Sequence, residues 1–313
     1  YAFSGGLHGV GVSVTNALST RLAVTVKRDG EISSLEFADG GRVSVPLTVT
    51  GKCPKKTTGT WVRAWPDPAF FDSPRISLPE MERLLRAKAV LLPGVTVKLT
   101  VEREGGDLEK VWSYPNGLPQ YLAELLGDAE PLVPAFAGER YADGEAGNSG
   151  YAKGEGAAWV FAWSDGAVAA ESFVNLIHTS QGGTHEAGLK AGVFDAVKAF
   201  AEHHGLLPRG VQLRQEDVCG RMSFVLSARI LDPQFQGQVK EKLNSREAVK
   251  LVSSMVRDPF EVWLNGHVEH GKLLADLAAK AAASRLKSAQ KVEKRKSSSA
   301  LLTVTPHRRW YSG

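Results

Sequence analysis

The 313-residue sequence is poor in cysteine and contains no long apolar run. Its two cysteines, Cys53 and Cys219, lie far apart without metal-ligand spacing, which favours free thiols in a reducing compartment over a disulfide or a zinc site. No stretch approaches the ~20 apolar residues that a membrane-spanning helix needs. The first residues show no signal-peptide pattern. The sequence therefore predicts a cytoplasmic protein with no membrane partner.

A strong excess of charge of one sign is also absent, since the formal net charge is only +4. This value permits contact with nucleic acid without requiring it. Basic residues gather near the C-terminus, at Arg285, Lys287, Lys291, Lys294, Arg295 and Lys296. Such a cluster is typical of a solvated helix end. A segment that contacts DNA is the alternative interpretation.

Length and a hydrophobic content of 43% predict two domains with sizeable cores. Alternating apolar and polar residues over 22–49, with a turn at 40–41, indicate antiparallel strands, and 59–65 is a further strand. Residues 78–90 have helical periodicity, and 95–101 again has the pattern of a strand.

The second half begins with a helix after Asn116. Residues 138–156, rich in glycine and charge, predict a mobile insertion without regular structure. Residues 157–163 and 172–177 have the pattern of paired strands, and a helix follows Gly183. A strand over 224–230 precedes a helix over 247–256, which Pro259 is expected to interrupt, and Gly271 is expected to begin a long alanine-rich helix.

Residues 4–12, Ser-Gly-Gly-Leu-His-Gly-Val-Gly-Val, form a glycine-rich loop before a predicted short helix. Glycines reach positive φ, so successive N–H groups can converge on a phosphate at a helix N-terminus. A tight structural turn explains the same spacing equally well. The Lys-Ser/Thr pair of a Walker loop is absent from it, and no strand precedes it as in a dinucleotide fold.

The sequence of this loop resembles the ATP lid of the B subunits of bacterial type IIA topoisomerases. Three further motifs of that family follow in order, at 59–67, 181–186 and 232–240. The segments 71–75, 88–95 and 207–211 resemble topoisomerase IV more than gyrase. The resemblance covers about residues 1–299.

This resemblance implies an α+β fold. Residues 1–115 would be the C-terminal part of a GHKL-type ATP-binding sandwich with its lid. Residues 116–299 would be a transducer domain of the ribosomal S5 domain 2-like class, with a βαβ crossover. Residues 300–313 form an unmatched tail.

The resemblance also implies an ATP-binding site. Its lid residues would be Gly6, Leu7, His8, Gly9, Val10, Gly11 and Val12. Thr60 would help to hold the adenine, and Lys240, with Gln238, would reach the γ-phosphate. In an extended segment both side chains would point the same way, with Val239 facing away. Without the resemblance, His8 is a structural histidine, Thr60 a packed strand residue and Lys240 a surface lysine.

The segment 181–186 places His185 beside Glu186, but neighbouring side chains diverge and no nucleophile has a fitting spacing. It therefore predicts a structural strand-to-helix turn, with Thr184 as a helix cap.

The implied function is that of the ATPase subunit of topoisomerase IV, which couples ATP binding and hydrolysis to DNA strand passage, decatenation and relaxation. The implied cofactors are ATP and Mg²⁺. The implied partners are DNA, the A subunits of topoisomerase IV in a heterotetramer and a second copy at a homodimerising N-gate, on the nucleoid. The family's catalytic glutamate, its magnesium-binding asparagine and its adenine-binding aspartate map to no residue here, and the C-terminal metal-binding domain is also missing. We therefore expect a fragment with negligible ATPase activity of its own.

Three alternatives remain at this point. The first alternative is a gyrase B subunit, which would support negative supercoiling. The second is a member of the heat-shock chaperones or mismatch-repair ATPases, whose lids are related, although the downstream motifs argue against them. The third is that the isolated chain acts as a non-catalytic module for DNA binding or dimerisation.

Overall fold

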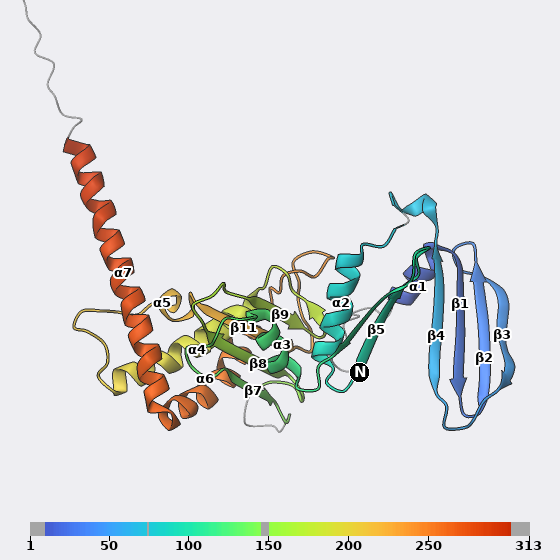
Figure 1. The fold of residues 1–313 in the computed structure, drawn as a ribbon, viewed down its shortest axis with the longest axis horizontal. Helices are drawn as coiled ribbons and strands as arrows, with labels where there is room; N and C mark the ends of the chain where they lie inside the picture. Colours follow the sequence, from blue (N-terminus) through green and yellow to red (C-terminus); the bar gives the residue numbers. More distant parts are fainter. Residues whose placement is uncertain (1–9, 74, 145–149, 302–313) are drawn as a thin grey trace, which may run out of the picture. The chain divides into compact units, whose positions relative to one another are not determined.

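The computed structural model describes residues 10–73, 75–144 and 150–301, with side chains described up to residue 290 (Figure 1). The chain divides into two compact units, Ser4–Leu84 and Leu85–Gly313. The α+β class is confirmed by elements of both kinds in the chain. The boundary between residues 115 and 116 concerns the family's domains and stays a prediction.

The first unit is built on a four-stranded antiparallel sheet of order β3-β2-β1-β4. Its elements are α1 (Gly11–Ala17), β1 (Ser19–Arg28), β2 (Glu31–Ala38), β3 (Arg42–Lys52), β4 (Gly59–Pro66) and the 3-10 helix η1 (Pro68–Phe70). The predicted strands over 22–49 and 59–65 are confirmed. An additional turn at Asp29 and Gly30, both with positive φ, divides β1 from β2.

The second unit is built on a mixed sheet of order β10-β9-β11-β8-β7. Its strands are β7 (Phe136–Tyr141), β8 (Gly156–Trp163), β9 (Ala170–Val174), β10 (Ile177–His178) and β11 (Met222–Arg229). Strands β9 and β11 are parallel, and the chain between them forms α4 (Thr184–His203) and α5 (Gln215–Cys219). This is the predicted βαβ crossover.

Strands β8 and β9 share this sheet but do not pair with each other, because β11 lies between them. The predicted pairing of 157–163 with 172–177 is therefore wrong. A separate antiparallel hairpin consists of β5 (Thr96–Val101) and β6 (Leu108–Ser113).

Helices cover both faces of the sheet. On one face, Trp159, Phe161 and Trp163 of β8 belong to the same buried cluster as Leu189 of α4 and Phe260 of α6 (Glu247–Gly266). On the other face, alternate strand residues such as Val160 and Ala162 pack with α2 (Leu78–Leu91) and α3 (Gly117–Leu126). The second unit thus has three layers, as expected for a sheet that is apolar on both faces.

Helices α4 and α6 cross at two glycines. A Cβ added to Gly188 would lie 2.6 Å from the Val249 carbonyl oxygen, and one added to Gly192 would lie 2.8 Å from that of Ser253. The two glycines are four residues apart and so lie on the same face of α4. They let the two helix backbones approach each other closely.

Helix α6 continues through Pro259 to Gly266, and α7 runs from Val268 to Leu301. The predicted interruption at Pro259 is wrong, as is the predicted start at Gly271. Proline removes one backbone donor, but Phe260 and Leu264 beyond it are fully buried and keep the last turns of α6 in place. Gly271 lies inside α7, where an added Cβ would come within 2.4 Å of the Phe200 ring.

The predicted irregular stretch 138–156 is partly a strand, because β7 extends to Tyr141. Gly138 pairs with Trp159 of β8, and a Cβ there would lie 3.0 Å from the indole ring. The glycine thus makes room for a neighbouring tryptophan in a regular strand. Residues 145–149 lie outside the described residues, and so do residues 302–313 of the unmatched tail.

Candidate functional site

Residues 234–244, which we call the Lys240 loop, lead from β11 toward α6 and close on themselves as a small hairpin. The Gln236 N–H donates to the Lys242 carbonyl at 2.8 Å, and the Asn244 N–H donates to the Gln234 carbonyl at 2.7 Å. An isolated antiparallel bridge joins Phe235 to Leu243, which is fully buried. The ends of the loop are therefore fixed and its tip projects.

The tip carries Gln238 and Lys240 in a turn. Gly237 has φ +77° and Lys240 has φ +59°, so the chain reverses here instead of running extended. The expectation that alternation along an extended segment aligns Gln238 with Lys240 is therefore wrong. Gly237 and Lys240, both with positive φ, form a turn at this tip, and Val239 between Gln238 and Lys240 is 76% exposed.

The predicted strand-to-helix turn at 181–186 is confirmed, since it joins β10 to α4. The expected cap at Thr184 is wrong. The N-cap residue of α4 is Gly183, and the Thr184 hydroxyl donates instead to the Leu243 carbonyl at 3.5 Å. The turn is thus in direct contact with the Lys240 loop.

A chain of polar side chains lies beneath this turn. The Ser172 hydroxyl donates to the Glu186 carboxylate at 2.7 Å and lies 2.6 Å from the Thr179 hydroxyl. His185 Nε2 lies 3.0 Å from the same Thr179 hydroxyl. His185 is fully buried, and its burial lowers the pKa to about 3. A neutral imidazole shielded from solvent holds the first turn of α4 to the sheet and cannot exchange protons with a substrate. Sequence reasoning missed Ser172, in β9, and Thr179, just after β10, because no local pattern shows that their hydroxyl groups turn toward α4.

The described part of the lid begins at the N-cap of α1. Val10 is that N-cap, Gly11 and Val12 are the first helical residues, and all three are exposed. Thr60 is an exposed residue of β4 and pairs with Val26 of β1. Helix α1 contacts β1 and β4, so the first unit holds Thr60 and the end of the lid. The remaining lid residues, Gly6, Leu7, His8 and Gly9, lie outside the described residues.

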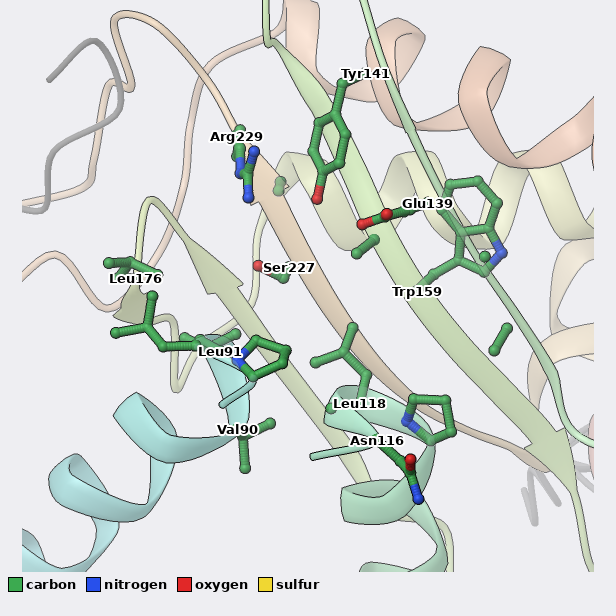
Figure 2. Close-up of a pocket in the computed structure, with 18 of the residues that line it drawn as sticks. Val90, Leu91, Asn116, Leu118, Glu139, Tyr141, Trp159, Leu176, Ser227 and Arg229 are labelled. Atoms are coloured by element: carbon green, nitrogen blue, oxygen red, sulfur yellow. The ribbon is translucent and has the colours of Figure 1, made fainter. Parts of the chain in front are cut away.

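The second unit contains a pocket of about 710 Å³ that sequence reasoning did not predict. Figure 2 shows apolar side chains of Leu91 and Leu118 on one side and the Tyr141 hydroxyl and Glu139 carboxyl turned toward its middle. The Arg229 guanidinium lies 4.3 Å from the centre of the Tyr141 ring. No single motif signals this pocket, because its lining comes from six separate segments.

The basic C-terminal segment is partly committed to internal contacts. Arg285 of α7 donates through Nε and Nη2 to the Asp217 carboxylate of α5, at 3.0 and 2.7 Å, and through Nη2 to the Gln212 carbonyl. Burial disfavours the charged form of Asp217, but hydrogen bonds from Arg285 and from the Arg214 N–H outweigh it, so the pKa of Asp217 lies below its usual range. Lys287 is exposed. The side chains of Lys291, Lys294, Arg295 and Lys296 lie outside the description.

Within the described residues, no group of three or more His, Cys, Asp or Glu is arranged to hold a metal ion. No described helix is long and apolar enough to cross a membrane.

Residues 117–294 match the family model described as DNA gyrase B. This is more than half of the 313 residues. The chain belongs to the DNA gyrase B family. The matched segment lies entirely within the second unit and includes the Lys240 loop and the turn beneath it.

Within this family, the chain is similar to curated relatives that are topoisomerase 4 B subunits. The protein of Escherichia coli strain K12 is 44% identical over 303 residues, which cover 95% of this chain and 45% of that protein. The protein of Pseudomonas aeruginosa is 46% identical over 298 residues, which cover 95% and 46%. The chain thus spans less than half the length of these relatives.

Two solved structures of the family share the fold. The ATP-binding domain of topoisomerase IV from Francisella tularensis, solved with a small-molecule inhibitor, is 34% identical with a TM-score of 0.72, and the alignment covers 90% of this chain and 75% of that one. The 43K ATPase domain of gyrase B from Thermus thermophilus, in complex with an aminocoumarin, is 27% identical with a TM-score of 0.73, covering 94% and 76%.

Proposed function

We propose that this chain is the lid and transducer part of a topoisomerase IV ATPase subunit. The protein would couple ATP binding and hydrolysis to DNA strand passage, and so decatenate and relax DNA. The identity of 44–46% to topoisomerase 4 B subunits supports this choice over gyrase B, whose solved ATPase domain is 27% identical. Negative supercoiling as a gyrase subunit is the second candidate.

The observation that carries the proposal is the construction of the Lys240 loop. A lysine ammonium is a compact charge with three donors, well suited to a terminal phosphate. Gln238 adds an amide donor to the same tip, and the closing hydrogen bonds hold the loop ends. This donor set fits the γ-phosphate of ATP, which is the group that ADP lacks. Lys240 would thereby sense the γ-phosphate, while Thr60 and the lid residues would hold the rest of the nucleotide.

Magnesium and the partners belong to the proposal for the longer protein. No cluster of three or more His, Cys, Asp or Glu occurs among the described residues, so no residue of this chain is assigned to the ion. The proposed partners are DNA, the A subunits of topoisomerase IV and a second copy at the N-gate. The nucleoid in the cytoplasm is the proposed place of action, and the two unpaired cysteines are compatible with it.

The decisive experiment compares Lys240→Ala with the wild type in titrations with a non-hydrolysable ATP analogue and with ADP. A charge-assisted hydrogen bond contributes about 1.5–3 kcal/mol, so loss of the ammonium should weaken analogue binding by about 10- to 100-fold. ADP binding should stay unchanged. The matched control is Lys242→Ala, which removes a neighbouring exposed lysine of the same loop and should leave both affinities unchanged.

An unchanged ratio of the two affinities in Lys240→Ala would refute the sensor role. ATP turnover by this chain is expected to be negligible, and robust turnover that Lys240→Ala abolishes would contradict that expectation. Salt-sensitive DNA binding that is indifferent to nucleotide would instead support the non-catalytic DNA-binding module.

A further inference from the structure

We propose that the turn at residues 181–184 is the mount of the Lys240 loop, and that Gln181 and Gly183 are positioning residues for the γ-phosphate contact. The inference rests on the proposed sensor role of Lys240, but the mount itself is a separate structural claim. The two claims can therefore fail independently.

Backbone hydrogen bonds join the mount to the returning half of the loop. The Gln181 N–H donates to the Glu241 carbonyl at 3.0 Å, and the Thr184 N–H donates to the Leu243 carbonyl at 3.1 Å. In the opposite direction, the Leu243 N–H donates to the Gly182 carbonyl at 3.0 Å. These three bonds form a short parallel ladder, and the first of them ends one residue after Lys240.

Gly183 makes this ladder possible. It has φ +137°, and a Cβ at this position would lie 2.3 Å from the carbonyl oxygen and 2.6 Å from the nitrogen of Leu243. Both atoms are backbone atoms of a fully buried residue, so they cannot swing aside as the end of a flexible side chain would. Any side chain at Gly183 must therefore push the loop away from the turn.

Gln181 adds a side-chain contact at the tip. Its Nε2 donates to the Glu241 carboxylate at 2.7 Å. Together with the backbone bond between the same two residues, this contact fixes the neighbour of Lys240 from two directions. Because Gln181 contacts the loop and not a nucleotide, its effect on binding would act through the position of Lys240.

The other side of the mount is tied to the body of the unit. The Glu186 carboxylate, one turn into α4, accepts from Ser172 of β9, and the buried His185 contacts Thr179. Further along α4, Gly188 and Gly192 bring the helix against the backbone of α6. These contacts fix the first turns of α4, so the mount is a firm support for the loop.

The first test measures the mount without any nucleotide. Amide hydrogen exchange is followed for the loop in Gly183→Ala and in Gly205→Ala. Gly205 is the matched control, because it lies just beyond the other end of α4, has φ +62° and has open space where a Cβ would go. We expect faster exchange at Leu243 in Gly183→Ala alone. Equal protection of the loop in both variants would overturn the mount.

The second test measures the consequence for the nucleotide in Gln181→Met, which keeps the size of the side chain and removes its donor. We expect the preference for the ATP analogue over ADP to fall several-fold, with ADP affinity unchanged. The exposed Gln236, in the same loop, supplies the control variant Gln236→Met. The double variant Gln181→Glu with Glu241→Gln exchanges the two hydrogen-bonding partners and keeps a bond between them. It should therefore prefer the ATP analogue over ADP as the wild type does.

The outcomes separate the two claims. If Lys240→Ala lowers the preference for the analogue and Gln181→Met does not, the positioning role is wrong. If Lys240→Ala leaves the preference unchanged, or if this chain binds neither nucleotide, the proposed sensor role fails in this chain. The hydrogen-exchange measurement on Gly183→Ala then still decides whether the turn holds the loop.

Discussion

Replacement of Gly192 by alanine should destabilise the second unit, although alanine is the better helix former. The added Cβ would lie 2.8 Å from the Ser253 carbonyl oxygen, whereas ordinary contact begins near 3.4 Å. Helices α4 and α6 would have to separate by the difference of 0.6 Å. A gap of that size forfeits about a quarter to a half of the dispersion energy of the atoms that line it.

Two opposing effects set the magnitude. Helix propensity favours alanine over glycine by about 1 kcal/mol. Overpacking in a well-packed interface costs about 1–3 kcal/mol. Because the obstacle is backbone and the buried Val193 and Val252 lie beside it, we expect the upper part of this range. The free energy of unfolding should then fall by about 1–2 kcal/mol net.

Urea unfolding followed by tryptophan fluorescence measures this difference, since Trp159 and Trp163 are buried in the same core. The control is Gly266→Ala at the end of α6, where a Cβ would meet nothing within 4 Å. That variant should be unchanged or slightly more stable. The reasoning is refuted if Gly192→Ala unfolds at the same urea concentration as Gly266→Ala with the same m-value.

Three further predictions concern titration and thiol access. Burial lowers the pKa of His185 to about 3, so below about pH 6.5 the unfolded chain protonates this imidazole while the folded chain keeps it neutral. The free energy of unfolding should therefore fall by about 1.4 kcal/mol for each pH unit below 6.5. Urea unfolding at pH 7 and pH 5 should show a smaller loss in His185→Gln. The pKa of Asp217 lies below its usual range, so its ion pair with Arg285 stabilises the folded chain above about pH 4, and this stabilisation is lost as the pH falls through the lower pKa of the folded state. Arg285→Gln should therefore flatten the fall of Tm between pH 5 and pH 3. Burial raises the pKa of Cys219 to about 12, so a maleimide should label only Cys53 in the native protein, and rapid native labelling of Cys219 would contradict the buried position.

Local sequence patterns determined several elements well. Alternation in residues 22–49 specifies β1, β2 and β3, because successive strand residues face opposite sides of a sheet. Helical periodicity likewise specifies α2. The family resemblance, carried by short motifs such as the one at 181–186, agrees with the match over residues 117–294.

Other features depend on contacts between distant segments. The break expected at Pro259 does not occur, because Phe260 and Leu264 are buried against elements that the local pattern does not reveal. Strand β8 pairs with β11 instead of β9, although β11 begins some fifty residues after β9 in the chain. The alternation of apolar and polar residues within a strand does not determine which strand it pairs with.

The candidate site shows the same division. The sequence by itself determined that residues 238–240 carry an amide and an ammonium suited to a phosphate, since that chemistry belongs to the side chains. Only the tertiary structure decided that a left-handed turn presents them, and that Gly183 and Gln181 lie against Glu241 and Leu243. The physical reason is that these contacts join residues about sixty positions apart, and folding of the intervening α4, α5 and β11 brings them within hydrogen-bonding distance.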